Sequence, residues 1–185
     1  MKIFGTGLSK TGSVSLFYAM KHLGFSCKHY IYVDDCEERP TVNHIKPIVD
    51  KYKFINGAPI NYMYRELAEL YPNSKYIWMT RNFEQWIESC KAHFEQFVTK
   101  SWHRTLLWGT LGFDFEKFRV RYYDHMCDMI DFSLSHDVLE LPLEMDDHWK
   151  WVRLCEFLNM EIANQFSNFP HANKDEDRVW IDLST

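Results

Sequence analysis

The chain of 185 residues has little glycine and little proline, with seven and six residues, and no segment is rich in either. That composition excludes collagen-like repeats and low-complexity linkers. No apolar run approaches the roughly 20 residues of a membrane-spanning helix, so none is predicted. The N-terminal MKIFGTGLSK lacks the apolar core of a secretory signal peptide. Basic residues number 21 against 26 acidic ones, which argues against a non-specific nucleic-acid binder.

Cysteine pairs are also absent. There is no C-x-x-C motif, so neither a zinc site nor a thioredoxin-like site is indicated, and we expect no metal. There is no Asn-x-Ser/Thr glycosylation signal either. We therefore expect a cytoplasmic protein with buried, unpaired thiols at Cys27, Cys36, Cys90, Cys127 and Cys155.

Apolar residues are plentiful, at 46% of the chain with 17% aromatic, and predict one globular domain over residues 1–185. Short apolar segments alternate with segments of helical period. The predicted strands are 2–5, 25–32, 53–56, 75–80 and 138–143. The predicted helices are 13–23, 39–52 (interrupted by Pro47), 60–71, 83–97, 117–135 and 147–158.

This alternation predicts an α/β fold in three layers, with a mainly parallel, roughly five-stranded central sheet flanked by helices. Ligands bind such sheets at the carboxyl ends of the strands. Functional residues are therefore expected just after residues 5, 29, 56, 80 and 143.

Three expectations concern packing. Within 117–135, a helical stripe is expected to face the core; its residues are Val120, Tyr123, Cys127, Ile130 and Leu134. Core or packing positions are expected for Trp149, Leu154, Phe157 and Leu158. Surface positions are expected for His22, His125 and His136.

Residues 5–16, GTGLSKTGSVSL, run from a predicted strand into a predicted helix. Backbone N–H groups at a helix start attract anions, and Lys10 adds a full positive charge. This pattern predicts a phosphate-binding loop. The Walker A motif is not met, because Ser9 replaces its second glycine and Phe4 its first. The alternative is an ordinary strand-to-helix turn with an exposed lysine.

SKTGSVSL resembles the 5′-phosphosulfate-binding loop of sulfotransferases, P-K-[ST]-G-T-T-x-L, with Ser9 for proline and Val14 for a hydroxyl residue. Residues 76–90, YIWMTRNFEQWIESC, are similar to the family pattern R-D-x-x-x-W-x-x-S, with Asn82 in the place of the Asp. The stretch from VLELPLEMDD to FPHAN continues the resemblance, which therefore spans residues 3–173.

The resemblance implies a P-loop NTPase-like fold. It also implies transfer of a sulfuryl group from 3′-phosphoadenosine 5′-phosphosulfate (PAPS) to a hydroxyl or amine, releasing 3′-phosphoadenosine 5′-phosphate (PAP). Lys10 would stabilise the leaving phosphate oxygen, and Arg81 and Ser89 would bind the 3′-phosphate. The implied donor-binding residues are Gly7, Leu8, Ser9, Lys10, Thr11, Gly12, Ser13, Val14, Ser15, Arg81 and Ser89.

The general base is less obvious. Many family members carry His or Asp two residues before a proline after the third strand, where this chain has Gly57. A branch resembling heparan sulfotransferases places a Glu at the end of the second strand, near His29 here. We therefore expect His29 to be the base, the alternative being a strand-end histidine bonded to a backbone carbonyl. Weaker candidates are His44, His93 and His103.

Residues 98–118 fall where the family covers its acceptor. Their aromatic side chains would form an apolar pocket for a small-molecule acceptor, or simply pack on the sheet; they include Trp102, Trp108, Phe113 and Phe115. Lys100 and Arg104 are expected to be solvated.

Three other functions compete with this one. A small-molecule or nucleotide kinase using ATP is disfavoured by the missing Walker A glycines and by the Arg81–Ser89 pair, which suits a 3′-phosphate. A PAP-binding protein without transferase activity is favoured by Gly57 and Val14. An interaction protein without a ligand requires both phosphate motifs to be accidental.

Overall fold

The computed structural model describes residues 1–31, 41–96, 107–161 and 168–171. Its strands lie in the order β2-β3-β1-β4-β5, and every neighbouring pair is parallel. They are β1 (Ile3–Gly5), β2 (Cys27–His29), β3 (Phe54–Asn56), β4 (Lys75–Thr80) and β5 (Asp137–Pro142). The helices described are α1 (Ser13–His22), α2 (Val42–Val49), α3 (Ile60–Leu70), α4 (Phe83–Gln96), α6 (Phe115–Ser133) and α7 (Asp147–Leu158). The α/β architecture predicted from the alternation is confirmed.

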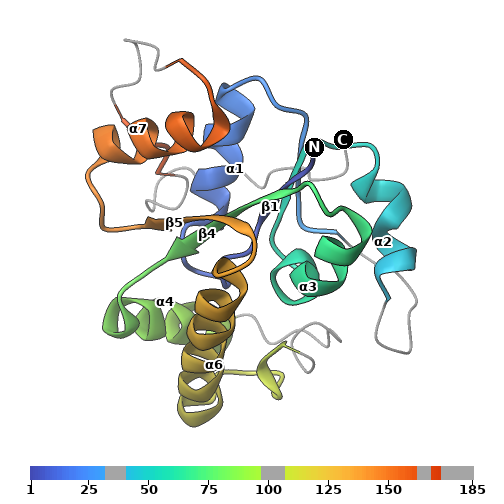
Figure 1. The fold of residues 1–185 in the computed structure, drawn as a ribbon. Helices are drawn as coiled ribbons and strands as arrows, with labels where there is room; N and C mark the ends of the chain where they lie inside the picture. The colour runs from blue at the N-terminus through green and yellow to red at the C-terminus, as the bar shows by residue number, and fades with distance from the viewer. Residues whose placement is uncertain (32–40, 97–106, 162–167, 172–185) are drawn as a thin grey trace.

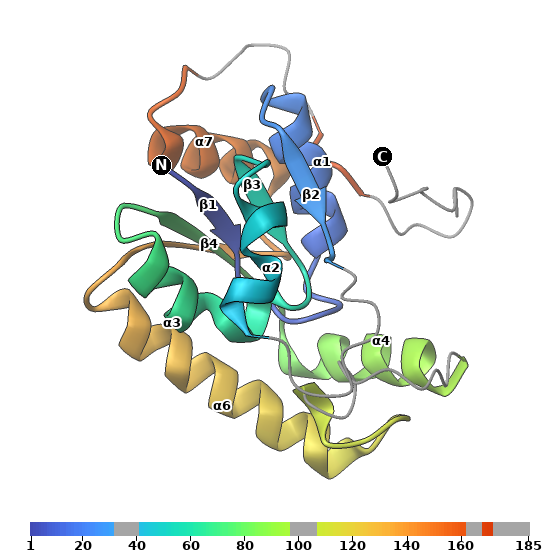
Figure 2. The same ribbon diagram turned by 90° about the vertical axis from the view of Figure 1, so that its right-hand side faces the viewer.

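Helices cover both faces of the sheet (Figures 1 and 2), because successive strand residues point to opposite sides. Phe4, Ile55 and Trp78 pack in one apolar cluster with α2, α3 and α6. Ile3 and Ile77, one position away, pack in a second cluster with α1 and α7. Both faces of the strands are thus buried, which explains why these strands are continuous apolar runs without polar alternation.

Two elements are clearly shorter than predicted, β2 and α2. Strand β2 ends at His29 because Tyr30 adopts a left-handed conformation with φ 64°. Helix α2 begins at Val42 and continues through Pro47 to Val49, so Pro47 does not interrupt it. A proline inside a helix removes one backbone hydrogen bond, and α2 remains short.

The helical face expected for 117–135 is wrong. Helix α6 buries Phe118, Tyr122, His125, Met129 and Phe132. The apolar stripe from Val120 to Leu134 lies on the opposite, exposed side. Both sets repeat with the same helical period, so the pattern alone does not determine which one is buried. Trp149, also expected in the core, is 58% exposed on α7.

His125 is buried between α6 and the sheet, which corrects its expected surface position. Its ring makes edge contacts with Tyr64 and Trp78, with centroids 6.1 and 6.5 Å away. Burial lowers the pKa of His125 to about 3, although a backbone hydrogen bond with Thr6 opposes that shift. The side chain is therefore neutral at physiological pH.

The expectation of buried thiols holds only in part. Cys90 and Cys155 are buried, Cys27 is half-buried and Cys127 is exposed. All of these are unpaired, and Cys36 lies outside the described residues. Among the helices described, none is both long and apolar enough to span a membrane.

A third apolar cluster joins α4 to α6. It includes Leu8 from the loop after β1 together with Trp86, Phe94, Trp108 and Phe118. Trp108 stacks on Phe118 with ring centroids 4.3 Å apart and planes 5° from parallel. Trp108 is thus a packing residue, and the cluster sets α4 directly against the loop.

Because β1 and β3 approach closely at Gly5, we predict the effect of adding a side chain there. A Cβ at Gly5 would lie 2.5 Å from Asn56 Cβ and 3.3 Å from Phe54 Cζ. Gly5→Ala should therefore lower the free energy of unfolding by about 1–3 kcal/mol through overpacking. Gly112→Ala is the control, since nothing lies within 4 Å there. Urea denaturation measures both, and equal stabilities would contradict the packing described.

A second prediction concerns acid stability. Between pH 6.5 and 3 the unfolded chain binds a proton at His125 that the folded chain does not. The free energy of unfolding should therefore fall by about 1.4 kcal/mol per pH unit from this residue alone as the pH drops below 6.5. Denaturant melts of wild type and His125→Gln between pH 7 and 5 should show a shallower slope in the variant. The control is His148→Gln, at an exposed position, whose free energy of unfolding should change with pH as in the wild type.

Candidate functional site

Most of the predicted site residues lie at the carboxyl edge of the sheet, just after or at the ends of the strands. The loop of residues 6–12 follows β1, and Arg81 directly follows β4. His29 and Asn56 are the last residues of β2 and β3, and they are register partners. Because β1 lies between β3 and β4, the loop is flanked by Asn56 on one side and Arg81 on the other.

The loop backbone has an unusual conformation at two positions. Lys10 has φ 71°, and Gly12, the N-cap of α1, has φ 94°. A side chain at Gly12 would be strained by that φ and would also meet Leu143 Cδ1 at 2.7 Å. Thr11 closes the turn, since its hydroxyl donates to the Leu8 carbonyl over 2.7 Å and its N–H donates to the same oxygen over 3.3 Å.

Three backbone carbonyls at this loop and the start of α1 accept hydrogen bonds from side chains elsewhere. Trp86 Nε1 donates to Ser9 O over 2.9 Å, and Arg81 Nη1 donates to Lys10 O over 3.2 Å. Asn56 Nδ2 donates to Ser13 O over 2.6 Å. Since the C=O and N–H of a trans peptide point in opposite directions, these bonds turn the following N–H groups away from those side chains.

Helix α1 begins without a capping side chain and without an acidic residue in its first turn. Helices α6 and α7 instead begin with aspartates that accept from first-turn N–H groups, and Asn82 does the same for α4. Ser13 and Val14 are half-buried at the α1 start, and Ser15 is buried. The positive end of α1 is thus left available for an anion.

Arg81 is held firmly at this edge. Its backbone carbonyl accepts from the Tyr122 hydroxyl over 2.7 Å, in addition to its own bond to Lys10 O. Its Nε is buried and has no hydrogen-bond partner. A buried guanidinium N–H without a partner is costly, and an anion at this point would satisfy it.

Lys10 and Arg81 share a neighbour on α4. Burial raises the pKa of the Cys90 thiol, and the charges of Lys10 and Arg81 act in the opposite direction. Both cations therefore lie near Cys90. Ser89, half-buried, precedes Cys90 and lies one helical turn after Trp86, on the side of α4 that contacts the loop.

On the other side of the loop, His29 Nδ1 lies 2.8 Å from Asn56 Oδ1. Asn56 is 1% exposed, and its Nδ2 is used by Ser13 O, so its oxygen must accept the proton of His29 Nδ1. This places His29 in the tautomer with a lone pair on Nε2. Burial lowers the pKa of His29, with the Asn56 bond opposing it, so the ring is neutral at pH 7.

Gly57, in the position where a family base was sought, lies against the His29 ring. A Cβ on Gly57 would be 3.2 Å from His29 Cε1, and Gly57 has φ 81°. The glycine therefore makes room for a histidine on the neighbouring strand. His44 belongs instead to the capping box of α2, while His93 lies on α4 and His103 outside the described residues.

Three of the expected acceptor aromatics lie in the described part of the chain, and two of them, Trp108 and Phe113, pack on Phe118. Trp108 is buried by packing, and Phe113 lies 5.2 Å from Phe118. Phe115 is 47% exposed. Trp102, Lys100 and Arg104 lie outside the described residues.

The sequence analysis predicts no role for Asn56 or Tyr122, which both contact site residues in the structure. For Asn56 a signal was present, because it is a polar residue that ends the apolar run KFIN.

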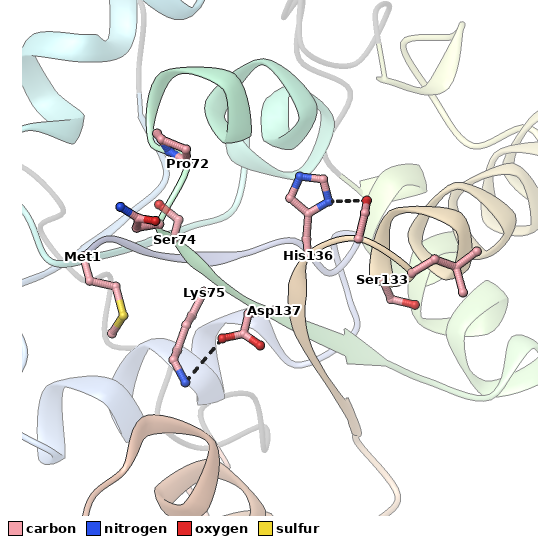
Figure 3. Close-up of a pocket in the computed structure, with 10 residues that line it drawn as sticks. Met1, Pro72, Ser74, Lys75, Ser133, His136 and Asp137 are labelled. Carbon is pink, nitrogen blue, oxygen red and sulfur yellow. Dashed lines mark hydrogen bonds and ion pairs between the residues drawn. The ribbon is translucent and has the colours of Figure 1, made fainter.

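A hollow of about 530 Å³ lies at the opposite, amino edge of β4 and β5 (Figure 3), lined among others by Ser74, His136 and Asp137. Its lysine, Lys75, donates to Phe157 O and lies 3.7 Å from Asp137. It is therefore separate from the loop. The described part of the chain has no group of three or more His, Cys, Asp or Glu side chains suited to a metal ion.

Comparisons with known proteins bear on the family and the fold. The model of the sulfotransferase domain family matches residues 2–178. No curated protein sequence matches significantly. Mouse sulfotransferase SULT7A1, solved in complex with PAP, superposes with a TM-score of 0.57 at 13% identity over 88% of this chain. The match spans 60% of that longer protein and shows a shared fold. Because the family model covers nearly the whole chain, this protein belongs to the sulfotransferase family.

Proposed function

We propose that this protein transfers a sulfuryl group from PAPS to a hydroxyl or amine of a small-molecule acceptor and releases PAP. The observation that carries the proposal is the uncapped start of α1 beside two cationic residues, one of which has a buried N–H without a partner. Family membership supports the reaction class, and the PAP in the SULT7A1 complex supports the nucleotide.

The donor would lie along the carboxyl edge. Its 5′-phosphosulfate suits the N–H groups of residues 7–15 together with Lys10, since the α1 terminus and the lysine both favour negative charge. Its 3′-phosphate suits Arg81 and Ser89. The Arg81 guanidinium would donate to the ligand through Nε, while its Nη1 donates to Lys10 O of the loop.

The reaction needs charge stabilisation and a base. As the acceptor oxygen bonds to sulfur and the bond from sulfur to the 5′-phosphate oxygen breaks, Lys10 stabilises the negative charge left on that oxygen. His29 Nε2 takes the acceptor proton, because Nδ1 already donates to Asn56. Asn56 is a positioning residue that fixes the His29 tautomer and ties the base to the start of α1 through Ser13 O.

A second candidate function is PAP binding without transfer. Val14 favours it, since it supplies no hydroxyl at a position where the family carries one. Gly57 does not favour it by itself, because the His29 ring lies beside that position. The kinase alternative lacks comparable support, because Arg81 and Ser89 flank the loop where ATP has no 3′-phosphate to offer them.

The donor site makes the first functional prediction. At roughly 100 times its Kd, PAP should raise the free energy of unfolding by about 2.7 kcal/mol and the melting temperature by several degrees. ADP, which has no 3′-phosphate, should give a smaller shift. Lys10→Ala and Arg81→Lys should each abolish or greatly reduce the PAP shift.

The matched controls for that experiment are exposed residues of the same type. Lys91→Ala, on the exposed side of α4, is the control for Lys10→Ala, and Arg153→Lys, on α7, is the control for Arg81→Lys. Both variants should leave the PAP shift unchanged. A larger shift with ADP or ATP than with PAP would support the kinase function. No shift with any nucleotide would contradict a donor site at this loop.

The base makes a second prediction. In ¹⁵N-labelled protein, long-range proton–nitrogen NMR should show His29 protonated on Nδ1 at pH 7, with a pKa below the usual 6.5. Asn56→Asp should raise the pKa of His29, because a carboxylate favours the imidazolium form. Asn43→Asp, at an exposed position on α2, should leave it unchanged.

Activity provides the second readout for the base. With labelled PAPS and a panel of phenols, alcohols and amines, His29→Ala should lower kcat roughly 10²–10⁴-fold without changing PAP binding. Transfer that survives His29→Ala would remove it as the base. PAP binding with no transfer to any acceptor would favour the binding-only function.

A further inference from the structure

Buried polar atoms without a hydrogen-bond partner gather between the end of β1, the start of α3 and the middle of α6. Among the described residues, they are Thr6 Oγ1, both side-chain amide atoms of Asn61, Arg121 Nε and His125 Nε2. Thr6 and Asn61 are fully buried, and His125 is 2% exposed. A buried polar atom without a partner destabilises the folded state, so a group of them requires an explanation.

The contacts of His125 connect these residues. Its ring bonds to the backbone of Thr6 and makes an edge contact with Tyr64, the two ring centroids being 6.1 Å apart. Arg121 precedes His125 by four residues on α6, and Asn61 precedes Tyr64 by three on α3, so each pair shares a helix face. Helices α3 and α6 lie side by side (Figures 1 and 2). Thr6, Asn61, Arg121 and His125 are therefore called the polar cluster.

The polar cluster adjoins the proposed site at two points. Thr6 directly precedes Gly7, the first of the donor-binding residues. The N–H of Asn61 donates to Gly57 O over 3.3 Å, and the His29 ring lies against Gly57. An acceptor that presents one group to the donor and to His29 would therefore have its neighbouring groups beside the polar cluster.

The unpartnered atoms include both hydrogen-bond donors and acceptors. Arg121 Nε and Asn61 Nδ2 donate, Asn61 Oδ1 accepts, and the Thr6 hydroxyl can do either. Since the Thr6 N–H donates to Ile77 O, the His125 ring donates through Nδ1 to the Thr6 carbonyl, and its Nε2 keeps a lone pair. A carboxylate has no proton for the two acceptors, and an ammonium has no lone pair for the two donors. A hydroxyl group both donates and accepts.

We propose that the polar cluster binds neighbouring hydroxyl groups of the acceptor, so that the acceptor is a sugar or a similar polyol. The inference rests on the proposed function and narrows its class of acceptor. A site built to hydrogen-bond hydroxyl groups discriminates strongly, because an analogue without them leaves buried polar atoms unpartnered. The polar cluster thus determines acceptor specificity, while Lys10 and His29 carry out the chemistry.

The first experiment measures binding, so that it does not depend on transfer. Saturation-transfer NMR with and without PAP should detect at least one of D-glucose, D-galactose, N-acetyl-D-glucosamine and myo-inositol. Cyclohexanol is the matched control for myo-inositol, since it has the same ring with a single hydroxyl group, and it should not bind. Phenol should not bind either.

The second experiment removes polar atoms at nearly constant side-chain volume. Thr6→Val and Asn61→Leu should each weaken binding of that sugar or polyol, and lower its kcat/KM, about tenfold or more. The melting-temperature shift with PAP should stay as in the wild type. Ser74→Ala is the control, because the Ser74 hydroxyl is also buried without a partner but lies at the amino edge of the sheet. It should bind the sugar like the wild type.

Buried water molecules are the competing explanation for the polar cluster, and the ligand-free protein distinguishes the two. If the cluster serves the acceptor, Asn61→Leu should raise the melting temperature, because an apolar side chain replaces an unpartnered amide. If water molecules satisfy the amide, the variant should instead melt at a lower temperature and bind every sugar as the wild type does.

Three results would overturn the proposal. They are sugars and myo-inositol that bind no better than cyclohexanol, sugar binding that survives both Thr6→Val and Asn61→Leu, and the pattern expected for buried water. Failure of the proposed function gives a different result. Sugar binding that depends on Thr6 and Asn61, without any transfer from PAPS, would support the polar cluster and exclude the reaction.

Discussion

The site depends on how three backbone carbonyls around the loop after β1 are held. Ser9 O, Lys10 O and Ser13 O each accept a hydrogen bond from a side chain of another element, namely Trp86, Arg81 and Asn56. With the carbonyls engaged, the peptide N–H groups face the other way, and α1 begins without a side-chain cap. The left-handed backbone at Lys10, which costs of order 1–3 kcal/mol, persists because these contacts over-determine it.

Two of those three side chains have a second role in the proposed mechanism. Arg81 binds the loop through Nη1 and leaves a buried Nε without a partner, so loop shape and anion affinity are coupled in one residue. Asn56 binds Ser13 O with its amide nitrogen and His29 with its amide oxygen. A change at either residue would therefore disturb the loop together with the chemistry.

Helix α6 shows how one element serves two surfaces. Its buried side supplies Tyr122, which holds the Arg81 carbonyl, and Phe118, on which Trp108 stacks. Its outer side carries a second set of apolar residues with the same helical period, and these are exposed.

The sequence by itself determined the parallel α/β fold, the strand ends at which a site would form, the loop with Lys10, and Arg81 at the end of a strand. Those features depend on local apolar runs, glycines and two motifs, each made of residues that are close in sequence. Tertiary structure decided which stripe of α6 is buried and that His125 lies in the core, because periodicity does not say which side of a helix meets the sheet. It also decided that Asn56 joins His29 to α1, since β2, β3 and the loop meet only through the strand order β2-β3-β1.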